Sequence, residues 1–205
     1  MLKDFKPIII VAGDPKSIFL EIYFKSLKKN KFKNPLILII NEKILLEQMR
    51  ALKYDFKINK LNTNNFNQKK LNNRKINIIH VPFNKKFLSE YIYRSFEKAL
   101  LLAKKNDKIN LINGPINKKK ILKQRFLGIT EYLDFKTKSK GKSVMLIYNK
   151  NLSVSPLTTH LPLKKVHKFI SKKKLINHVQ QITNFYKKRF NICLLYTSDA
   201  ADDDA

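Results

Sequence analysis

Short apolar runs alternate with amphipathic stretches along most of the chain. The runs are rich in β-branched residues, as is typical of strands buried on both faces of a parallel sheet. They lie at 7–12, 35–40, 76–81 and 108–112. The amphipathic stretches between them predict helices that pack on the sheet. This alternation predicts an α/β fold with parallel strand pairs.

Helices are indicated by periodicity and by capping residues. Asn41 is placed to cap a helix over Glu42–Leu52, and Ser171 to cap the last helix of the chain. Three apolar stripes at helical spacing are then predicted. They are Ile18, Ile22 and Leu27 in the first helix; Leu88, Ile92, Phe96, Ala99 and Ala103 in a core helix; and Leu175, Val179, Ile182 and Tyr186 in the last.

Further strands are predicted where the pattern is less regular. Tyr54–Ile58 is a candidate third strand, and 59–75 reads as a loop because it is rich in Asn, Lys and Gln. Ser143–Tyr148 and Leu152–Leu157 are strand-like runs that lead to His160. Pro162 is then well placed as the first residue of a following helix.

The net charge of +28 invites a nucleic-acid-binding interpretation. Against this interpretation, the chain has 38 lysines but only 5 arginines, and the lysines are scattered along the sequence instead of forming one stripe. We therefore expect neither a nucleic-acid partner nor, with no apolar run near 18 residues, a membrane partner. A positive field could instead draw in small anionic substrates such as phosphate esters.

The single cysteine, Cys193, excludes an intrachain disulfide, and the sequence reads as cytoplasmic. The segment Leu194–Ala205 differs in composition from everything before it. It contains no Lys, Asn or Ile and carries 4 of the 15 acidic residues. We expect residues 1–193 to be an incomplete, truncated two-lobed α/β unit and 194–205 to be a non-native tail.

Ligand sites in open α/β sheets lie beyond the carboxyl ends of the strands. Three turns are placed there: Gly13–Ser17, Asn113–Lys118 and the segment around His160. The first could present backbone N–H groups to a phosphate, or be an ordinary turn between a strand and a helix. In the second, Lys118 could neutralise an anion or be a surface lysine. His160 could be a metal ligand or a hydrogen-bonded loop histidine.

Four stretches, taken together and in this order, resemble a known family. They are Gly13-Asp-Pro with Glu21, Asn113-Gly-Pro-Ile-Asn-Lys118, Gly128-Ile-Thr-Glu131 and Leu157-Thr-Thr-His-Leu-Pro-Leu163. The family is 4-hydroxythreonine-4-phosphate dehydrogenase of vitamin B6 biosynthesis. The resemblance spans about residues 7–193, or roughly the first three-fifths of a family member.

The resemblance implies an isopropylmalate-dehydrogenase-like α/β fold and a homodimer with active sites at the subunit interface. It also implies NAD as oxidant and a divalent metal (Zn, Mg or Co) held by three histidines. His160 occupies the position of the first metal ligand, and the other two family histidines lie downstream. Thr130 matches a substrate-contacting threonine, and Lys118 would hold the substrate phosphate. The cofactor contacts and the general base are not indicated.

The implied activity is NAD-dependent oxidation and decarboxylation of 4-phosphohydroxy-L-threonine, with the chain as given inactive. Ile129 stands where the family usually has a substrate-binding histidine, and 16–19 replaces a glycine-richer turn. These departures leave open a dehydrogenase of a related phosphorylated hydroxy acid. A non-catalytic basic module that binds nucleic acid is the alternative from another class, and salt-sensitive binding would reveal it.

Overall fold

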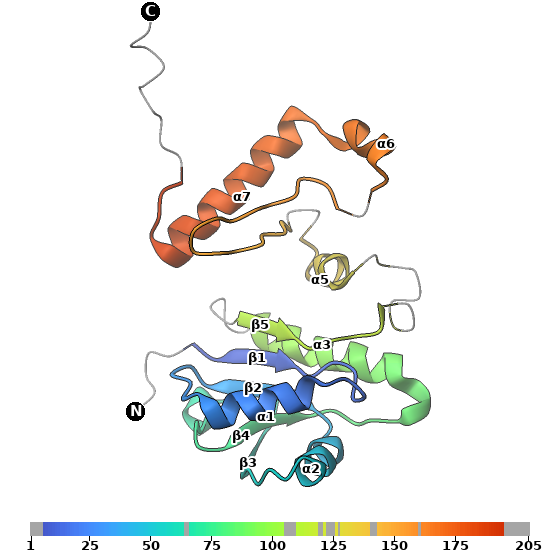
Figure 1. The fold of residues 1–205 in the computed structure, drawn as a ribbon, viewed down its shortest axis with the longest axis vertical. Coiled ribbons are helices and arrows are strands. Elements are labelled where there is room, and N and C mark those ends of the chain that lie inside the picture. Colours follow the sequence, from blue (N-terminus) through green and yellow to red (C-terminus); the bar gives the residue numbers. More distant parts are fainter. Residues whose placement is uncertain are drawn as a thin grey trace, which may run out of the picture. The chain divides into compact units, whose positions relative to one another are not determined.

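The computed structural model describes residues 6–63, 66–104, 110–118, 121, 126, 128–139, 143–159 and 161–194. The chain divides into two compact units, with the boundary between Arg125 and Phe126. The first unit is built on a sheet, and the second on helices and a pair of extended segments (Figure 1). Among the described helices, none is both long and apolar enough to cross a membrane.

All strand pairs in the sheet of the first unit are parallel. The strand order is β3-β4-β2-β1-β5. The strands are β1 (Ile8–Val11), β2 (Leu36–Ile40), β3 (Ile58–Leu61), β4 (Ile76–His80) and β5 (Asn110–Asn113). Strands β1, β2 and β4 are almost wholly buried, as continuous apolar runs predict for the centre of a parallel sheet. The predicted α/β class is confirmed.

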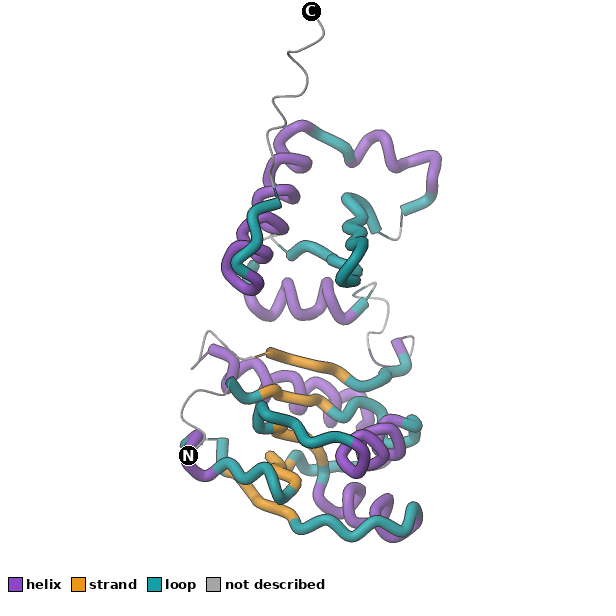
Figure 2. The backbone as a smooth tube through the Cα atoms, turned by 60° about the vertical axis from the view of Figure 1, so that its left-hand side comes forward, coloured by secondary structure: helices purple, strands orange, loops and turns teal. Residues whose placement is uncertain are grey.

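Helices cover both faces of this sheet (Figures 1 and 2). Helices α1 (Phe19–Lys29) and α2 (Glu42–Ala51) pack on one face, where their apolar side chains share a core with alternate residues of the central strands. Helix α3 (Leu88–Lys104) packs on β1, β2 and β5. The predicted stripe of α3 is confirmed at Ile92, Phe96 and Ala99, which are fully buried.

The buried face of α1 differs from the predicted one. Ile18 and Ile22 are 66% and 54% exposed, whereas Leu20, Tyr23 and Phe24 are buried. The physical reason is that the large aromatic side chains bury more apolar area than the isoleucines. The orientation of the helix therefore follows the aromatic residues.

The third strand also begins later than predicted, at Ile58 instead of Tyr54. Tyr54 and Phe56 instead pack their rings against Phe24, with ring centroids 5.3 and 5.8 Å apart. The predicted loop over 59–75 contains most of β3 and a short 3-10 helix, η1 (Gln68–Lys70). This segment is therefore more ordered than its composition indicated.

Asn77, in the centre of β4, fixes part of that segment. Its side chain is 1% exposed. Its Nδ2 donates to the carbonyl oxygens of Leu36 (3.0 Å) and Asn72 (3.1 Å). Its Oδ1 accepts from Asn59 Nδ2 (2.7 Å) and Asn72 N (2.9 Å). All four hydrogen-bonding positions of the buried amide are satisfied, as burial of a polar group requires.

The helix caps predicted at Asn41 and Ser171 are confirmed. The Asn41 side chain accepts a hydrogen bond from Ile44 N (3.3 Å) and donates to Val81 O (3.0 Å). It thus caps α2 and ties the end of β2 to the end of β4. Ser171 Oγ accepts from Lys174 N (3.3 Å) at the start of the last helix.

The second unit contains α5 (Ile129–Thr137), α6 (Leu163–Val166), a 3-10 turn η3 (His167–Phe169) and α7 (Lys172–Phe190).

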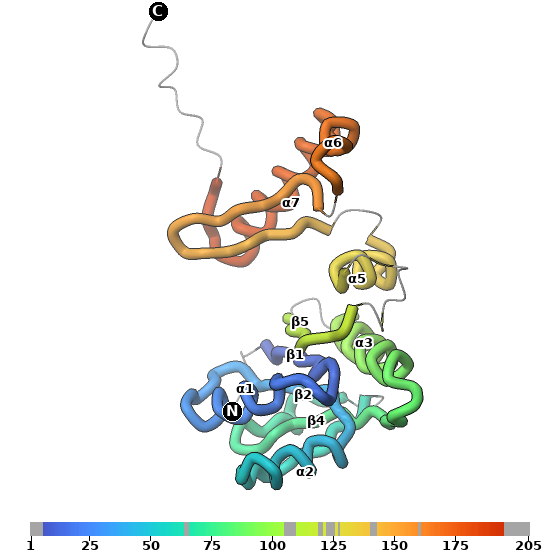
Figure 3. The backbone as a smooth tube through the Cα atoms, turned by 45° about the vertical axis from the view of Figure 1, so that its right-hand side comes forward, coloured from blue at the N-terminus to red at the C-terminus, as the bar shows by residue number. Residues whose placement is uncertain are grey.

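The prediction of strands at 143–148 and 152–157 is wrong. In the described part of this region they form one antiparallel bridge, between Ile147 and Val154, because the two segments have only each other to pair with. They run back along α7 (Figure 3). Pro162 precedes α6 as its cap instead of being its first residue.

Two side chains of α7 hold these segments. Tyr186 Oη donates to Ser153 Oγ (2.7 Å). His178 Nε2 lies 2.7 Å from Ser155 Oγ, and that hydroxyl donates to Met145 O. Because a hydroxyl has a single hydrogen, the His178 ring donates here. His178 is thus a hydrogen-bonded, partly buried histidine at the edge of the core.

Candidate functional site

The strand order reverses between β1 and β5. From β1 the chain moves to β2, then to β3 at the outer edge and back to β4 beside β2, and it finally places β5 on the other side of β1. In open α/β sheets, ligands bind beyond the carboxyl ends of the strands at such a reversal. Two of the predicted turns, Gly13–Ser17 and Asn113–Lys118, follow these two strands directly. The structure therefore brings them together.

Backbone hydrogen bonds join the two turns. Asp14 N donates to Pro115 O at 2.8 Å, and Gly114 N donates to Val11 O at 2.7 Å. The pairing of β1 with β5 is thus continued past the last residues of both strands. The two turns form one interlocked structure, which we call the β1/β5 junction.

Both glycines of the junction are required by the close approach of the two backbones. A Cβ atom on Gly114 would lie 2.2 Å from Ala12 O, and one on Gly13 would lie 2.4 Å from Pro115 O. Gly13 also has φ +80°, a conformation that favours glycine. The glycines are therefore explained by the contact between the turns.

The backbone of the first turn is occupied within the turn itself. Lys16 N donates to Asp14 Oδ1 (3.0 Å), Ser17 N to Asp14 O (3.0 Å) and Phe19 N to Ser17 Oγ (3.4 Å). This supports the interpretation of an ordinary turn between a strand and a helix. Among the described residues, the junction offers no open glycine cradle that would fit the phosphates of a dinucleotide.

Lys118 is presented by the second turn. Its side chain is exposed. Ile121 N donates to Asn117 O (3.0 Å), an i to i−4 bond that places Lys118 in the first turn of a helix. The sequence over 119–126 also reads as a helix, and most of it lies outside the described residues. A lysine held on a fixed backbone beyond the carboxyl end of β5 can supply a point charge for an anion.

A tyrosine that the sequence did not indicate also contacts this segment. Tyr93 Oη, on α3, donates to Ile121 O at 2.6 Å. Ile121 itself is fully buried. Tyr93 lies off the apolar stripe of α3, so periodicity assigned it no role. The sequence offered one sign of this contact, a tyrosine next to the apolar stripe of α3.

The polar groups at the ends of β2 and β4 are engaged with one another. His80 Nδ1 accepts from Glu42 N (3.3 Å), and His80 O accepts from Lys98 Nζ (2.9 Å). Lys60 Nζ lies 2.7 Å from Glu42 Oε1. His80 is the last residue of β4. These contacts occupy the polar groups at the carboxyl ends of β2 and β4. The β1/β5 junction is therefore the better candidate site.

Tyr91, on α3, contacts the backbone at the end of β2. Its hydroxyl accepts from Asn41 N at 3.3 Å. Burial raises the pKa of Tyr91 to about 12, and the hydrogen bonds from Asn41 and with Ser95 oppose part of that rise. The phenol is therefore neutral at physiological pH and acts as a structural group.

The third motif lies in the second unit, at the start of α5. Gly128 precedes the helix, and a Cβ atom there would lie 2.8 Å from Glu131 Oε2. The Glu131 side chain thus folds back over the first turn of the helix, and its Oε2 is buried without a hydrogen-bond partner among the described residues. Thr130 is exposed in that same turn. Ile129 begins the helix and is partly buried.

The metal prediction rests on His160, which lies outside the described residues. Within the described ranges, no three His, Cys, Asp or Glu side chains gather as a metal ion would require. The described residues therefore do not make up a metal site. His167 is exposed in η3, next to Lys168.

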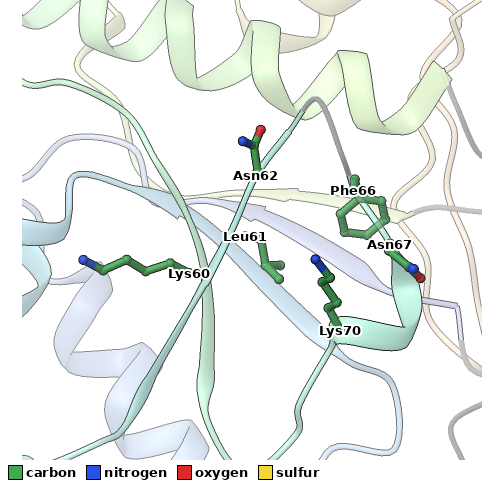
Figure 4. Close-up of a pocket in the computed structure, with 6 residues that line it drawn as sticks. All are labelled: Lys60, Leu61, Asn62, Phe66, Asn67 and Lys70. Carbon is green, nitrogen blue, oxygen red and sulfur yellow. The ribbon is translucent and has the colours of Figure 1, made fainter.

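A cavity lined in part by lysines lies at the outer edge of the sheet, where β3 is separated from β1 by two other strands. It has a volume of about 240 Å³ and lies beside β3 and η1. Its lining residues are Lys60, Leu61, Asn62, Phe66, Asn67 and Lys70 (Figure 4). Lys60 extends away from Lys70 in Figure 4, and its amine is paired with Glu42. The two lysines therefore do not converge on one anion.

Comparison with known proteins places the chain in a family. The model of the pyridoxal phosphate biosynthetic protein PdxA matches residues 31–194. The chain belongs to the PdxA family. A curated relative, 4-hydroxythreonine-4-phosphate dehydrogenase of Sulfurihydrogenibium sp. (strain YO3AOP1), is 37% identical over 67 residues, which are 33% of this chain and 20% of the relative.

Solved structures share the PdxA fold. The crystal structure of 4-hydroxythreonine-4-phosphate dehydrogenase from Klebsiella pneumoniae has a TM-score of 0.75 at 19% identity, over 89% of this chain and 60% of that one. The enzyme of that name from Burkholderia phymatum has a TM-score of 0.72 at 18% identity, over 90% and 59%. This chain thus spans about three-fifths of the length of these structures.

Proposed function

We propose that this chain supplies part of an NAD-dependent dehydrogenase that oxidises and decarboxylates 4-phosphohydroxy-L-threonine in pyridoxal phosphate biosynthesis. Within it, the β1/β5 junction holds the phosphate of the substrate through Lys118. The observation that carries this assignment is the exposed Lys118 on a turn interlocked with the turn after β1, in a chain of the PdxA family.

The chemistry of the substrate suits this junction. A phosphate monoester carries a charge of about −1.5 to −2 at neutral pH, so a lysine ammonium attracts it. The net charge of +28 adds a long-range field that concentrates such anions near the surface. Because the two turns are bonded to each other, Lys118 is held on a backbone that needs little reordering when the anion binds.

Three further assignments are part of the proposal, and they rest only on the resemblance of the four sequence motifs to the family. They are Thr130 as a second substrate contact, His160 as one ligand of a divalent metal, and NAD as the oxidant. The proposal also includes a homodimer. It further includes a cytoplasmic location, which the presence of a single cysteine supports. Each can fail without removing the phosphate contact at Lys118.

We expect the 205-residue chain by itself to give no NADH from NAD and 4-phosphohydroxy-L-threonine, with or without added metal. The reason is that it spans about three-fifths of the solved PdxA-family structures. Substrate binding at Lys118 is a separate expectation, because the β1/β5 junction lies within the first compact unit. NADH production by this chain would contradict the first expectation and leave the second in place.

Calorimetry on the 205-residue chain tests the proposal. 4-Phosphohydroxy-L-threonine should bind, and 4-hydroxy-L-threonine, which lacks the phosphate, should bind far more weakly. A hydrogen bond to a charged group contributes about 1.5–3 kcal/mol, so Lys118→Met should weaken binding roughly 10–100-fold.

Lys29→Met is the matched control for this measurement. It removes the same charge from the end of α1, where the chain returns to the amino end of β2. This variant should bind like the wild type. Equal binding of the two ligands, or equal losses in the two variants, would overturn the proposal.

A further inference from the structure

We propose that Tyr93 is a positioning residue for Lys118. Its hydroxyl anchors the far end of the segment whose near end is the β1/β5 junction. The inference deepens the proposed function and rests on it, since it concerns how the phosphate-binding lysine is held. Tyr93 itself makes no contact with the substrate in this assignment.

The anchor is made by a rigid part of the fold. Tyr93 projects from α3, whose neighbouring residues Tyr91 and Ile92 are buried against the sheet. The 2.6 Å bond from Tyr93 Oη ends on the carbonyl oxygen of the fully buried Ile121. This short hydrogen bond between a packed helix and a buried residue restrains the backbone at Ile121.

The other end of the segment is restrained independently. Gly114 is bonded to Val11, the last residue of β1, and Pro115 to Asp14 in the turn after β1. The described residues that follow the junction are Ile116, Asn117 and Lys118, and Asn117 O accepts from Ile121 N at 3.0 Å. Lys118 therefore belongs to a short stretch that is bonded to the junction before it, at Pro115, and to Tyr93 after it, at Ile121. Without the Tyr93 bond the stretch gains conformational freedom, which phosphate binding must then remove.

The substitution Tyr93→Phe isolates this role. It keeps the ring and its packing and removes only the hydroxyl. A neutral hydrogen bond of about 1 kcal/mol corresponds to about a fivefold change in an equilibrium constant. We therefore expect the variant to bind phosphate about fivefold more weakly while its fold is unchanged.

The four glycines of the chain give a sparse NMR reporter. Their preceding residues are all different: Ala12, Asn113, Leu127 and Lys140. Labelling with [15N]glycine together with [13C]carbonyl asparagine selects the Gly114 amide, and [13C]carbonyl alanine selects Gly13. Titration of the 205-residue chain with inorganic phosphate, followed at Gly114, measures the affinity at the junction.

Tyr186→Phe is the matched control, because it removes a tyrosine hydrogen bond of 2.7 Å in the second unit. The inference predicts a phosphate-dependent Gly114 shift in the wild type that Lys118→Met abolishes. Tyr93→Phe should need about fivefold more phosphate, and Tyr186→Phe should behave as the wild type. The Gly13 and Gly114 signals without phosphate should be alike in all four proteins.

The outcomes separate the two claims. If the wild type shows no Lys118-dependent shift, the phosphate contact of the proposed function fails and the positioning role fails with it. If that shift is present but Tyr93→Phe matches the wild type, only the positioning role is overturned. Loss of the folded glycine signals in Tyr93→Phe would show that the hydroxyl supports the whole unit, and would equally overturn it.

Discussion

Gly114→Ala tests whether the β1/β5 junction is as tightly interlocked as the structure indicates. The new Cβ atom would lie 2.2 Å from Ala12 O, 2.8 Å from Ala12 C and 3.1 Å from the Phe19 ring. Ordinary contacts between carbon atoms lie at about 3.5–4.0 Å. Two of these three atoms belong to the backbone at the end of a central strand, so a side-chain rotation cannot relieve the overlap.

The cost follows from two contributions. Overpacking a buried site costs about 1–3 kcal/mol. Separating the turns also loses the bonds from Gly114 N to Val11 O and from Asp14 N to Pro115 O, at about 0.5–1.5 kcal/mol each. The unfolding free energy of the first unit should therefore fall by about 2–6 kcal/mol, a large part of the 5–15 kcal/mol typical of a domain.

Urea unfolding followed by far-ultraviolet circular dichroism measures this change, since the chain has no tryptophan. The Gly13 amide signal reports the first unit separately, which matters because two units need not unfold together. Gly128→Ala is the matched control. Its Cβ would meet only the movable Glu131 carboxylate at 2.8 Å, so its cost should be about 1 kcal/mol or less. A Gly114→Ala chain as stable as the control would refute the interlocked junction.

Three further predictions concern stability. Asn77→Ala should cost about 2–4 kcal/mol, because it empties a fully buried site and leaves partly buried partners such as Leu36 O unsatisfied. An Asn77→Ala chain as stable in urea as the wild type would contradict the network. The raised pKa of Tyr91 should make the unfolding free energy fall as pH rises from about 10, the unfolded value, through about 12; Tyr91→Phe should lessen that fall, as denaturation at several pH values would show. Ser171→Ala should lower the stability of the second unit by about 1 kcal/mol, through loss of the cap on α7, with the Gly13 signal of the first unit unchanged.

The sequence was sufficient for the parts of the fold that rest on local pattern. Continuous β-branched runs mark the central strands because both faces are buried, and Asn41 and Ser171 mark helix starts because their side chains bond the free N–H groups there. The same periodicity misplaced the buried face of α1. It placed Ile18 and Ile22 on the buried face and left out Tyr23 and Phe24, although aromatic rings bury more area.

The parts that could not be predicted depend on contacts between distant residues. The bond from Tyr93 to Ile121 and the closeness of Gly114 to Ala12 exist only once β5 lies beside β1. Lys118 could be named from its motif, but its exposure and its two restraints could not. Ser143–Tyr148 has the composition of a strand, yet in the described structure its segment makes a single bridge because strand pairing also needs a neighbour.

The position of the bound phosphate among the 38 lysines is the central claim, and acetylation footprinting measures it most directly. The chain is acetylated briefly with and without 4-phosphohydroxy-L-threonine, and each lysine is quantified by mass spectrometry. The account predicts that protection is strongest at Lys118. Protection centred on Lys60 and Lys70 at the β3 edge, or spread evenly over the surface, would contradict it.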